Sequence, residues 1–366
     1  MGEDKNSGLQ AARAVAALAV AYFHSYIALR IFPETAQYQI PFLKEWGFLG
    51  VNFFFAISGY VICLVASKPS FTVRGFIIKR TFRLYPLYWT ALAAVAFMIL
   101  IGRYPAQSPG HFLYSMTLLP QPSASVYDVS WTLEREIVFY ALAVVTIPIV
   151  GIAGLAVVLA ALAFSGYLYG NPWSLHLVST TQADFLSGVL IFLIGRHIRL
   201  SFAASVSVFV VGLFALWWTR IHDFAFATTL SLAFILLGMI HLKLPWGHWS
   251  LRWLVRLGDA SYSLYLWHLI GFMISFILSF KIGFHPDWLC EPWRYGAITC
   301  CALFSIFTWE KIERPMIDLG NRLARLLDNP NNVVTDDRGL HGFMRSATRV
   351  VRDDVDSVTS GGGGSE

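Results

Sequence analysis

Long apolar stretches, separated by short polar ones, run along almost the whole chain. An α-helix needs about 20 mostly apolar residues to cross the hydrocarbon core of a bilayer, and ten stretches approach that length. They cover residues 9–30, 46–66, 84–102, 131–150, 152–170, 181–197, 202–219, 223–242, 259–280 and 294–312. Because backbone polar groups in a bilayer must be satisfied internally, the pattern predicts an all-α, polytopic membrane bundle of about ten transmembrane helices.

Composition supports this fold class. Of the 366 residues, 56% are hydrophobic and 13% are charged, against about 25% charged residues in a soluble domain. The bundle is expected to fill residues 1–327, because the loops are too short for a second folded domain. Residues 328–359 are polar and weakly patterned, which predicts a disordered cytoplasmic tail, and residues 360–366 have the composition of an artificial flexible linker.

Lysine and arginine are distributed unevenly between the two sets of loops. With a cytoplasmic N-terminus, 16 of the 27 fall on the inner side and 6 on the outer side. Positive charge accumulates on the cytoplasmic side of membrane proteins, so both termini are expected there. The net charge of +5 follows from this asymmetry and does not indicate nucleic-acid binding. The four cysteines lack the spacing of a metal site, so no metal ion is expected.

Two ionisable residues interrupt the first span, Arg13 and His24. They are 11 positions apart, which leaves them about 20° out of line and about 16 Å apart along one helix face. Ionisable groups inside a membrane are costly and usually face a cavity or a partner. Alternatively, Arg13 extends to a headgroup and His24 is a satisfied interfacial histidine.

The second span and the loop after it add further polar groups. Asn52 near the outer end and Ser58 deeper in the span either line a site or join helices by hydrogen bonds. The next loop is the most basic, and its Arg80 and Arg83 share one helical face. Their planar guanidinium groups suit phosphates, which favours a cytoplasmic phosphate-bearing ligand over simple contact with anionic lipid. Pro86 is expected to start the third span.

Three charges, Glu134, Arg135 and Glu136, enter the fourth span. From the direction of that span, Glu136 is expected in the outer leaflet, level with His24. A carboxylate beside a histidine can fix its tautomer and support it as a general base. This pair would then activate a hydroxyl group, unless the three charges only neutralise one another.

The last two spans carry the remaining candidates. His268 lies near mid-membrane, and Tyr262 and Tyr265, three residues apart, are expected to line one wall of a passage. His268 is favoured as a structural or pore-lining histidine over a second base, and chemistry nearer to it stays open as an alternative. Glu310 and Glu313 share a face on the cytoplasmic side and are expected to meet the arginine pair of the basic loop. Pro315 is expected to end the last helix.

Six motifs occur in an order that resembles the acyltransferase-3 membrane proteins, a group of bacterial sugar O-acyltransferases. The motifs are RAVAALAVAYFHSY, GVNFFFAISGYVI, KRTFRLYPLYW, WTLEREIVFY, SYSLYLWH and the final ERP. The resemblance covers about residues 9–318. It departs from the family pattern at Asn52, where Asp is common, and at Thr132, where Ser is common, so a role for position 52 in proton transfer is in doubt.

This resemblance implies an integral protein of the bacterial inner membrane that takes an acyl group from cytoplasmic acyl-CoA, with acetyl-CoA as the expected donor. The expected acceptor is a hydroxyl of a carbohydrate, polysaccharide or glycolipid. The chain is similar to the stand-alone exopolysaccharide acetyltransferases, which carry no fused extracytoplasmic domain. The lipid bilayer is the other expected partner.

The resemblance also implies that Arg13, His24, Arg80 and Arg83 are required for function. Arg13, Arg80 and Arg83 are expected to bind the donor's phosphates, and His24 to be the catalytic base, supported by Glu136. Asn52, Tyr265 and His268 are expected to contact substrate. Transfer directly from the thioester and transfer through an acyl-histidine both stay open. A proton-coupled transporter or flippase for a glycan or lipid, with the two histidines and Glu136 as a proton relay, is the alternative function.

Overall fold

The computed structural model describes residues 7–29, 39–170, 176–222, 226–246, 248–283 and 286–328. Within these ranges all regular structure is helical, which confirms the all-α class. The first half contains α1 (Ser7–Ala28), α2 (Pro41–Trp46), α3 (Leu49–Ala66), α4 (Val73–Leu100), α5 (Pro109–Ser115) and α6 (Ser130–Tyr169). The second half contains α7 (Gln182–Gly195), α8 (Phe202–His222), α9 (Ala227–His241), α10 (Trp249–Asp259), α11 (Ser261–Ile282), α12 (Asp287–Thr308), the π-helix η1 (Trp309–Glu313) and α13 (Arg314–Asp328).

Each of the ten predicted spans overlaps one of these helices. Six helices of the described chain are long and apolar enough to cross a membrane, namely α1, α3, α4, α6, α8 and α11, whereas α7 and α9 are apolar but shorter. The long α6 covers the fourth and fifth predicted spans, since it kinks at Gly151, whose φ of 73° is readily adopted only by glycine. The total of ten spans and the cytoplasmic placement of the termini stay predictions.

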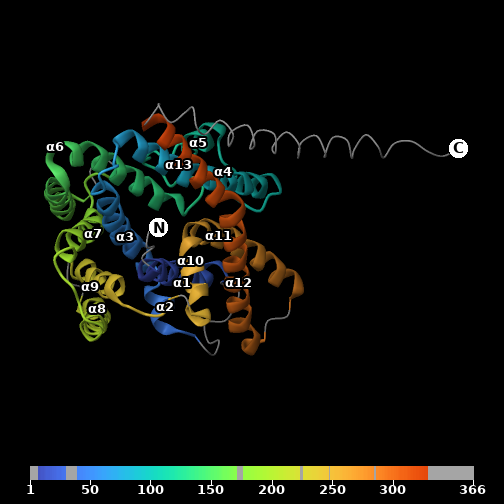
Figure 1. Ribbon diagram of the computed structural model, residues 1–366. Coiled ribbons are helices and arrows are strands. Elements are labelled where there is room, and N and C mark those ends of the chain that lie inside the picture. Colours follow the sequence, from blue (N-terminus) through green and yellow to red (C-terminus); the bar gives the residue numbers. More distant parts are fainter. Residues whose placement is uncertain are drawn as a thin grey trace, which may run out of the picture.

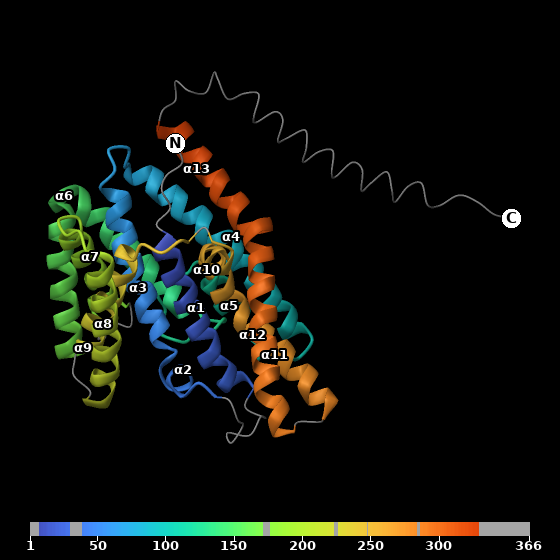
Figure 2. The ribbon, with the colours of Figure 1, turned by 60° about the horizontal axis from the view of Figure 1, so that its bottom comes forward.

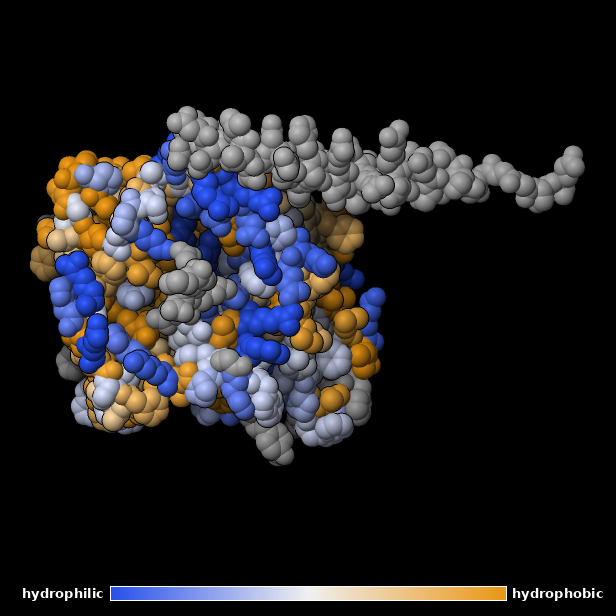
Figure 3. Space-filling model, viewed as in Figure 1, coloured by the Kyte–Doolittle hydropathy of each residue, from blue (hydrophilic) through white to orange (hydrophobic). Residues whose placement is uncertain are grey.

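Helix α1 lies in the middle of the bundle, between α3 on one side and α11 and α12 on the other (Figures 1 and 2). Helices α6 to α9 form one flank, where α3 and α7 pack closely. A Cβ atom added to Gly188 would lie 1.8 Å from the backbone oxygen of Ala56, so only glycine permits this approach. On the face in Figure 3, hydrophobic residues cover the edge over α6 and hydrophilic residues gather across the middle.

The connection between α4 and α6 folds back into the bundle, which the sequence did not indicate. Leu118 and Val126 are each only 1% exposed. Tyr88 of α4 donates a hydrogen bond to the backbone oxygen of Ser115 over 2.7 Å, and Tyr127 donates to the backbone oxygen of Leu266 in α11. Helix α6 therefore begins inside the protein, beside α11, rather than at the outer surface.

Two predicted helix boundaries at prolines are wrong. Pro86 lies inside α4, which begins 13 residues earlier at Val73, so the basic segment and the third span form one continuous helix. Pro315 does not end the last helix, because the chain continues through η1 into α13. Pro315 occupies the first turn of α13, where a proline needs no backbone N–H partner.

Helix α13 packs along α4, and the two helices run side by side at one edge of the bundle (Figure 2). A Cβ atom on Gly320 would lie 2.6 Å from Cβ of Phe82. At the other end, Thr72 donates to both carboxylate oxygens of Asp328, at 2.9 and 2.8 Å. Asp328 is thus part of α13 rather than of the predicted tail, and residues 329–366 lie outside the described residues.

Candidate active site

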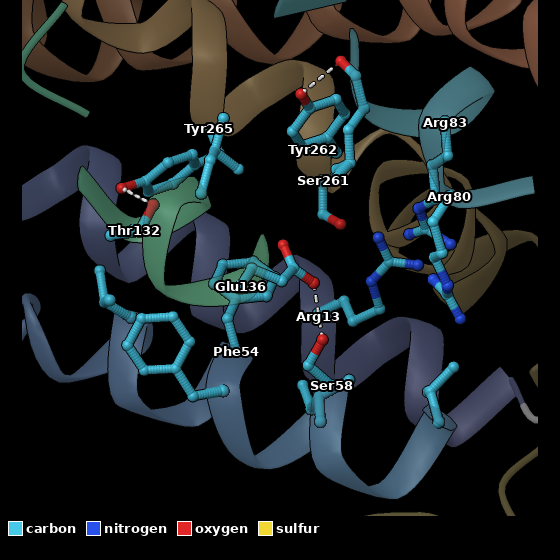
Figure 4. Close-up of a pocket in the computed structure, with 16 residues that line it drawn as sticks. Arg13, Phe54, Ser58, Arg80, Arg83, Thr132, Glu136, Ser261, Tyr262 and Tyr265 are labelled. Atoms are coloured by element: carbon cyan, nitrogen blue, oxygen red, sulfur yellow. Dashed lines mark hydrogen bonds between the residues drawn. The ribbon is translucent and has the colours of Figure 1, made fainter. Parts of the chain in front are cut away.

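A pocket opens between α1, α3, α4, α6 and α11, with about 740 Å³ of empty space including its open mouth. Figure 4 shows that the three labelled arginines gather at one end, Tyr265, Thr132 and Phe54 at the other, and Glu136 between them. The complete lining is Arg13, Val51, Phe54, Phe55, Ile57, Ser58, Val61, Arg80, Arg83, Leu84, Thr132, Leu133, Glu136, Ser261, Tyr262 and Tyr265.

The basic end brings together Arg13 from α1 with Arg80 and Arg83 from α4, as the sequence suggested. None of the three forms an ion pair within 4 Å with another described residue. Arg80 rests on two aromatic rings, 5.3 Å from the centroid of Phe76 and 5.2 Å from that of Tyr140. Three half-buried cations without ion-pair partners in the described chain make this end suitable for an anion.

Ser261 also faces the basic end (Figure 4) and was missed from the sequence. Its side chain is fully buried, and its Oγ has no hydrogen-bond partner in the described chain. It is the first residue of α11, a helix start at which the carboxylate of Glu313 already accepts hydrogen bonds from the backbone and the hydroxyl of Ser263. Such a helix start favours anions. The run Gly258-Asp-Ala-Ser before an apolar stretch was the available signal.

Glu136 lies between the two ends of the pocket rather than beside His24. Its Oε1 accepts hydrogen bonds from Ser58, over 2.6 Å, and from the hydroxyl of Tyr140. No hydrogen bond joins Glu136 to His24 in the described part of the chain. The expected Glu136–His24 pair is therefore a wrong prediction, because α6 begins deep in the bundle and carries Glu136 to the level of the arginines.

At the opposite end of the pocket, hydroxyl groups connect α6 with α11. Thr132 Oγ1 donates to the Tyr265 hydroxyl over 2.8 Å, and that hydroxyl donates to the backbone oxygen of Val129 over 3.1 Å. The ring centroid of His268 is 5.7 Å from that of Tyr265. The two histidines thus lie just beyond the end of the pocket that Tyr265 lines.

The two histidines contact each other. Nε2 of His268 is 3.0 Å from Nδ1 of His24, and the rings stack with centroids 5.0 Å apart. His268 is 1% exposed, and its Nδ1 is 2.7 Å from the backbone oxygen of Tyr265 and 3.3 Å from that of Leu264. The structure therefore brings His24 together with His268, two residues that are 244 positions apart.

The other predicted groups lie away from this pocket. Asn52 does not line it, because its Nδ2 donates to Asp184 of α7 over 2.7 Å, an acceptor that Thr229 also contacts over 2.6 Å. Glu134 accepts from Gln121 over 2.9 Å. Asp184 was overlooked in the sequence, although a lone carboxylate in an apolar span is a usable signal.

The two glutamates predicted to meet the arginine pair, Glu310 and Glu313, have different partners. Glu310 pairs with Arg256 of α10, so the expected contact with the arginine pair of α4 is a wrong prediction for this residue. Glu313 is 2% exposed and accepts a hydrogen bond from Ser263 over 2.7 Å. It also interacts electrostatically with Arg83 and Arg13, so Glu313 partly balances the basic end.

Comparison with known proteins identifies the family. Residues 6–309 match the model of the acyltransferase-3 family, described as an acyltransferase domain. The chain belongs to this family. Together with the six apolar helices that could span a membrane, this makes it a membrane acyltransferase, and favours that function over the transporter that the sequence left open.

The acyltransferase is similar to three curated proteins. It is 29% identical over 294 residues to the exopolysaccharide production protein ExoZ of Rhizobium meliloti (strain 1021), covering 75% of this chain and 90% of that protein. It is 26% identical to the putative membrane-bound transacylase BcsY of Komagataeibacter xylinus, covering 75% and 78%. It is 24% identical to nodulation protein 10 of Rhizobium leguminosarum bv. viciae, covering 75% and 83%. No solved structure matches the chain.

Proposed function

We propose that this acyltransferase takes an acetyl group from cytoplasmic acetyl-CoA and transfers it to a hydroxyl of a carbohydrate, polysaccharide or glycolipid in the bacterial inner membrane. The observation that carries the proposal is the basic end of the pocket, where three arginines without ion-pair partners in the described chain meet the start of α11. The name of the relative ExoZ, an exopolysaccharide production protein, supports a carbohydrate acceptor.

The phosphates of acetyl-CoA bind at Arg13, Arg80 and Arg83, and the Ser261 hydroxyl donates a further hydrogen bond to them. Guanidinium groups and helix starts both suit phosphate oxygens. The pantetheine arm runs past Glu136 toward Tyr265, and this places the thioester at the end of the pocket next to the histidine pair. Asn52 acts indirectly, by holding Asp184 in place.

His24 is the general base. Its Nε2 accepts the proton as the O–H bond of the acceptor breaks, and the acceptor oxygen bonds to the thioester carbonyl carbon. The C–S bond then breaks, and the departing sulfur takes the proton from His24. The products are the acetyl ester and free CoA thiol, and His24 returns to its starting state.

Release of CoA thiol from acetyl-CoA tests this function in purified protein in detergent, without any ion gradient. The parent is expected to release thiol, faster with a carbohydrate acceptor present. His24→Ala is expected to abolish release while it still binds CoA, and Arg80→Ala is expected to weaken CoA binding. The matched control is Arg74→Ala, an exposed arginine of the same helix that does not line the pocket.

Two results would contradict the proposal. Parent protein that binds no CoA would remove the assigned donor, and a folded His24→Ala variant that turns over as fast as the parent would remove the assigned base. Equal loss of CoA binding in the Arg74 and Arg80 variants would show a general charge effect instead of a site in the pocket.

A further inference from the structure

We propose that His268 is a positioning residue, which fixes the proton of His24 on Nδ1 and so leaves Nε2 of His24 as the basic atom. The proposal deepens the function above, because it assumes that His24 is the base of acyl transfer. It replaces Glu136, which does not reach His24, as the group that orients the base.

The hydrogen bonds that run from His24 through His268 to the backbone oxygen of Tyr265 can have only one donor-to-acceptor direction. A backbone carbonyl oxygen accepts hydrogen bonds and never donates one. Because Nδ1 of His268 lies 2.7 Å from the carbonyl oxygen of Tyr265, that nitrogen must carry a hydrogen. In a neutral imidazole the other nitrogen then has only a lone pair, so Nε2 of His268 is an acceptor.

The same step extends to His24. Its Nδ1 lies 3.0 Å from Nε2 of His268, and a hydrogen bond between them requires the hydrogen on His24, because the other atom is the acceptor. Nε2 of neutral His24 is then the nitrogen with the lone pair. The tautomer thus follows from the network of partners, as it must where hydrogens are not seen directly.

Burial keeps the pair neutral. His268 is 1% exposed, and no carboxylate of the described chain hydrogen-bonds to either ring. A charged imidazole there would lack a counter-ion, which is costly in an apolar interior. His24 is only partly buried, and besides His268 its ring has one hydrogen-bond partner in the described chain, the backbone oxygen of Val20 on the same helix. The basic atom is therefore the one that an incoming hydroxyl can reach.

This arrangement also stabilises the charge that forms during the reaction. When Nε2 of His24 takes a proton, the positive charge of the ring is shared with Nδ1–H, which points at the lone pair of His268. The carbonyl of Tyr265 keeps the His268 ring in this orientation, so no second proton has to move. The role corresponds to that of the third member of a catalytic triad, which orients the base and stabilises its charge without taking the proton itself.

Two substitutions separate positioning from packing. His268→Gln places an amide oxygen at the same reach from the backbone as the imidazole Nε2, so it can still accept from His24. His268→Leu has similar bulk but accepts nothing. In the proposed function, His268→Leu is expected to lower kcat roughly 100-fold, the cost of a misplaced reacting group. KM for acetyl-CoA should change little, and His268→Gln should recover most of the rate.

The decisive measurement does not depend on activity. Nitrogen-15 NMR of protein labelled at its 10 histidines, with the His24 signals assigned through a His24→Gln variant, reports which ring nitrogen carries hydrogen. We expect His24 to be protonated on Nδ1 in the parent and in His268→Gln. In His268→Leu it should revert to the Nε2-protonated form that free histidine prefers.

The outcomes distinguish the two proposals. A parent in which His24 is protonated on Nε2, or a leucine variant in which Nδ1 protonation persists, overturns the positioning role whatever the activity. A parent that shows the expected tautomer and its loss in the leucine variant, yet releases no thiol from acetyl-CoA, supports the positioning role and refutes the donor. Equal kcat in the leucine variant and the parent also overturns the role.

Discussion

Replacing Ser261 with alanine is expected to change ligand binding and stability in opposite directions. The Oγ of Ser261 is buried without a partner in the described chain, and an unsatisfied buried polar group costs about 1–3 kcal/mol. Its removal should therefore leave the free energy of unfolding of the ligand-free protein unchanged or higher. If this hydroxyl donates a hydrogen bond to a phosphate of CoA, its removal weakens the binding free energy by about 1.5 kcal/mol. This corresponds to about a tenfold higher Kd for CoA.

Ser263 provides the matched control, two residues further along α11 and equally buried. Its Oγ donates to Glu313 Oε2 over 2.7 Å, and it does not line the pocket. Ser263→Ala leaves a buried carboxylate short of a hydrogen bond, which should lower the free energy of unfolding by about 1.5–3 kcal/mol. Its Kd for CoA should stay within about twofold of the parent, because one missing hydrogen bond outside the pocket changes no ligand contact.

The assay pairs calorimetric titration of free CoA with thermal unfolding in the same detergent, for the parent and both variants. Free CoA is suitable because it carries the phosphates and cannot react. The reasoning fails if Ser261→Ala unfolds at a lower temperature than the parent and binds CoA as tightly, since Ser261 would then be a structural residue. It also fails if Ser263→Ala weakens CoA binding as much as Ser261→Ala does.

Two further predictions concern the arginines proposed to bind the phosphates of CoA and the packing of α3 against α7. Arg80→Gln should raise the Kd for CoA by about 10-fold or more at low salt, since a hydrogen bond to a charged group contributes about 1.5–3 kcal/mol. Titration with pantetheine, which lacks the phosphates, should show no such difference, and an equal loss for both ligands would contradict the phosphate role. Gly188→Leu should destabilise the fold by about 3 kcal/mol or more, because even a Cβ would lie 1.8 Å from the oxygen of Ala56. Gly110→Leu is its control, since nothing lies within 4 Å of a Cβ there, and equal gel-filtration yields for the two variants would refute the packing argument.

The helices of the bundle were largely predictable, because each apolar stretch is itself sufficient to form one. The kink at Gly151 lies between the fourth and fifth predicted spans, 131–150 and 152–170. Local rules were less useful at prolines. Pro86 and Pro315 were interpreted as helix boundaries, yet Pro86 lies inside α4 and Pro315 lies where η1 continues into α13. These two helices pack against each other, and this packing keeps both segments helical.

The sequence predicted which residues form the candidate site better than it predicted which of them contact one another. Arg13, Arg80 and Arg83 meet as expected, because α1 and α4 carry them to the same end of the pocket. Glu136 was assigned to the wrong partner, since counting residues along spans assumes that every helix starts at a membrane surface. The contact between His24 and His268 depends on how α1 packs against α11, and no pattern within either segment specifies it.

The pairing of α13 with α4 matters for how this protein is handled in the laboratory. Phe82, which packs on Gly320, lies in the sequence between Arg80 and Arg83 of the pocket's basic end, so the last helix supports the segment that carries them. A chain cut before Arg314 would retain every apolar helix and insert normally, but it would lose this brace. Affinity tags and reporter fusions therefore belong after Asp328. If a truncated protein inserts into the membrane but binds no CoA, the cause is the loss of α13 packing on α4 and not a wrongly assigned site.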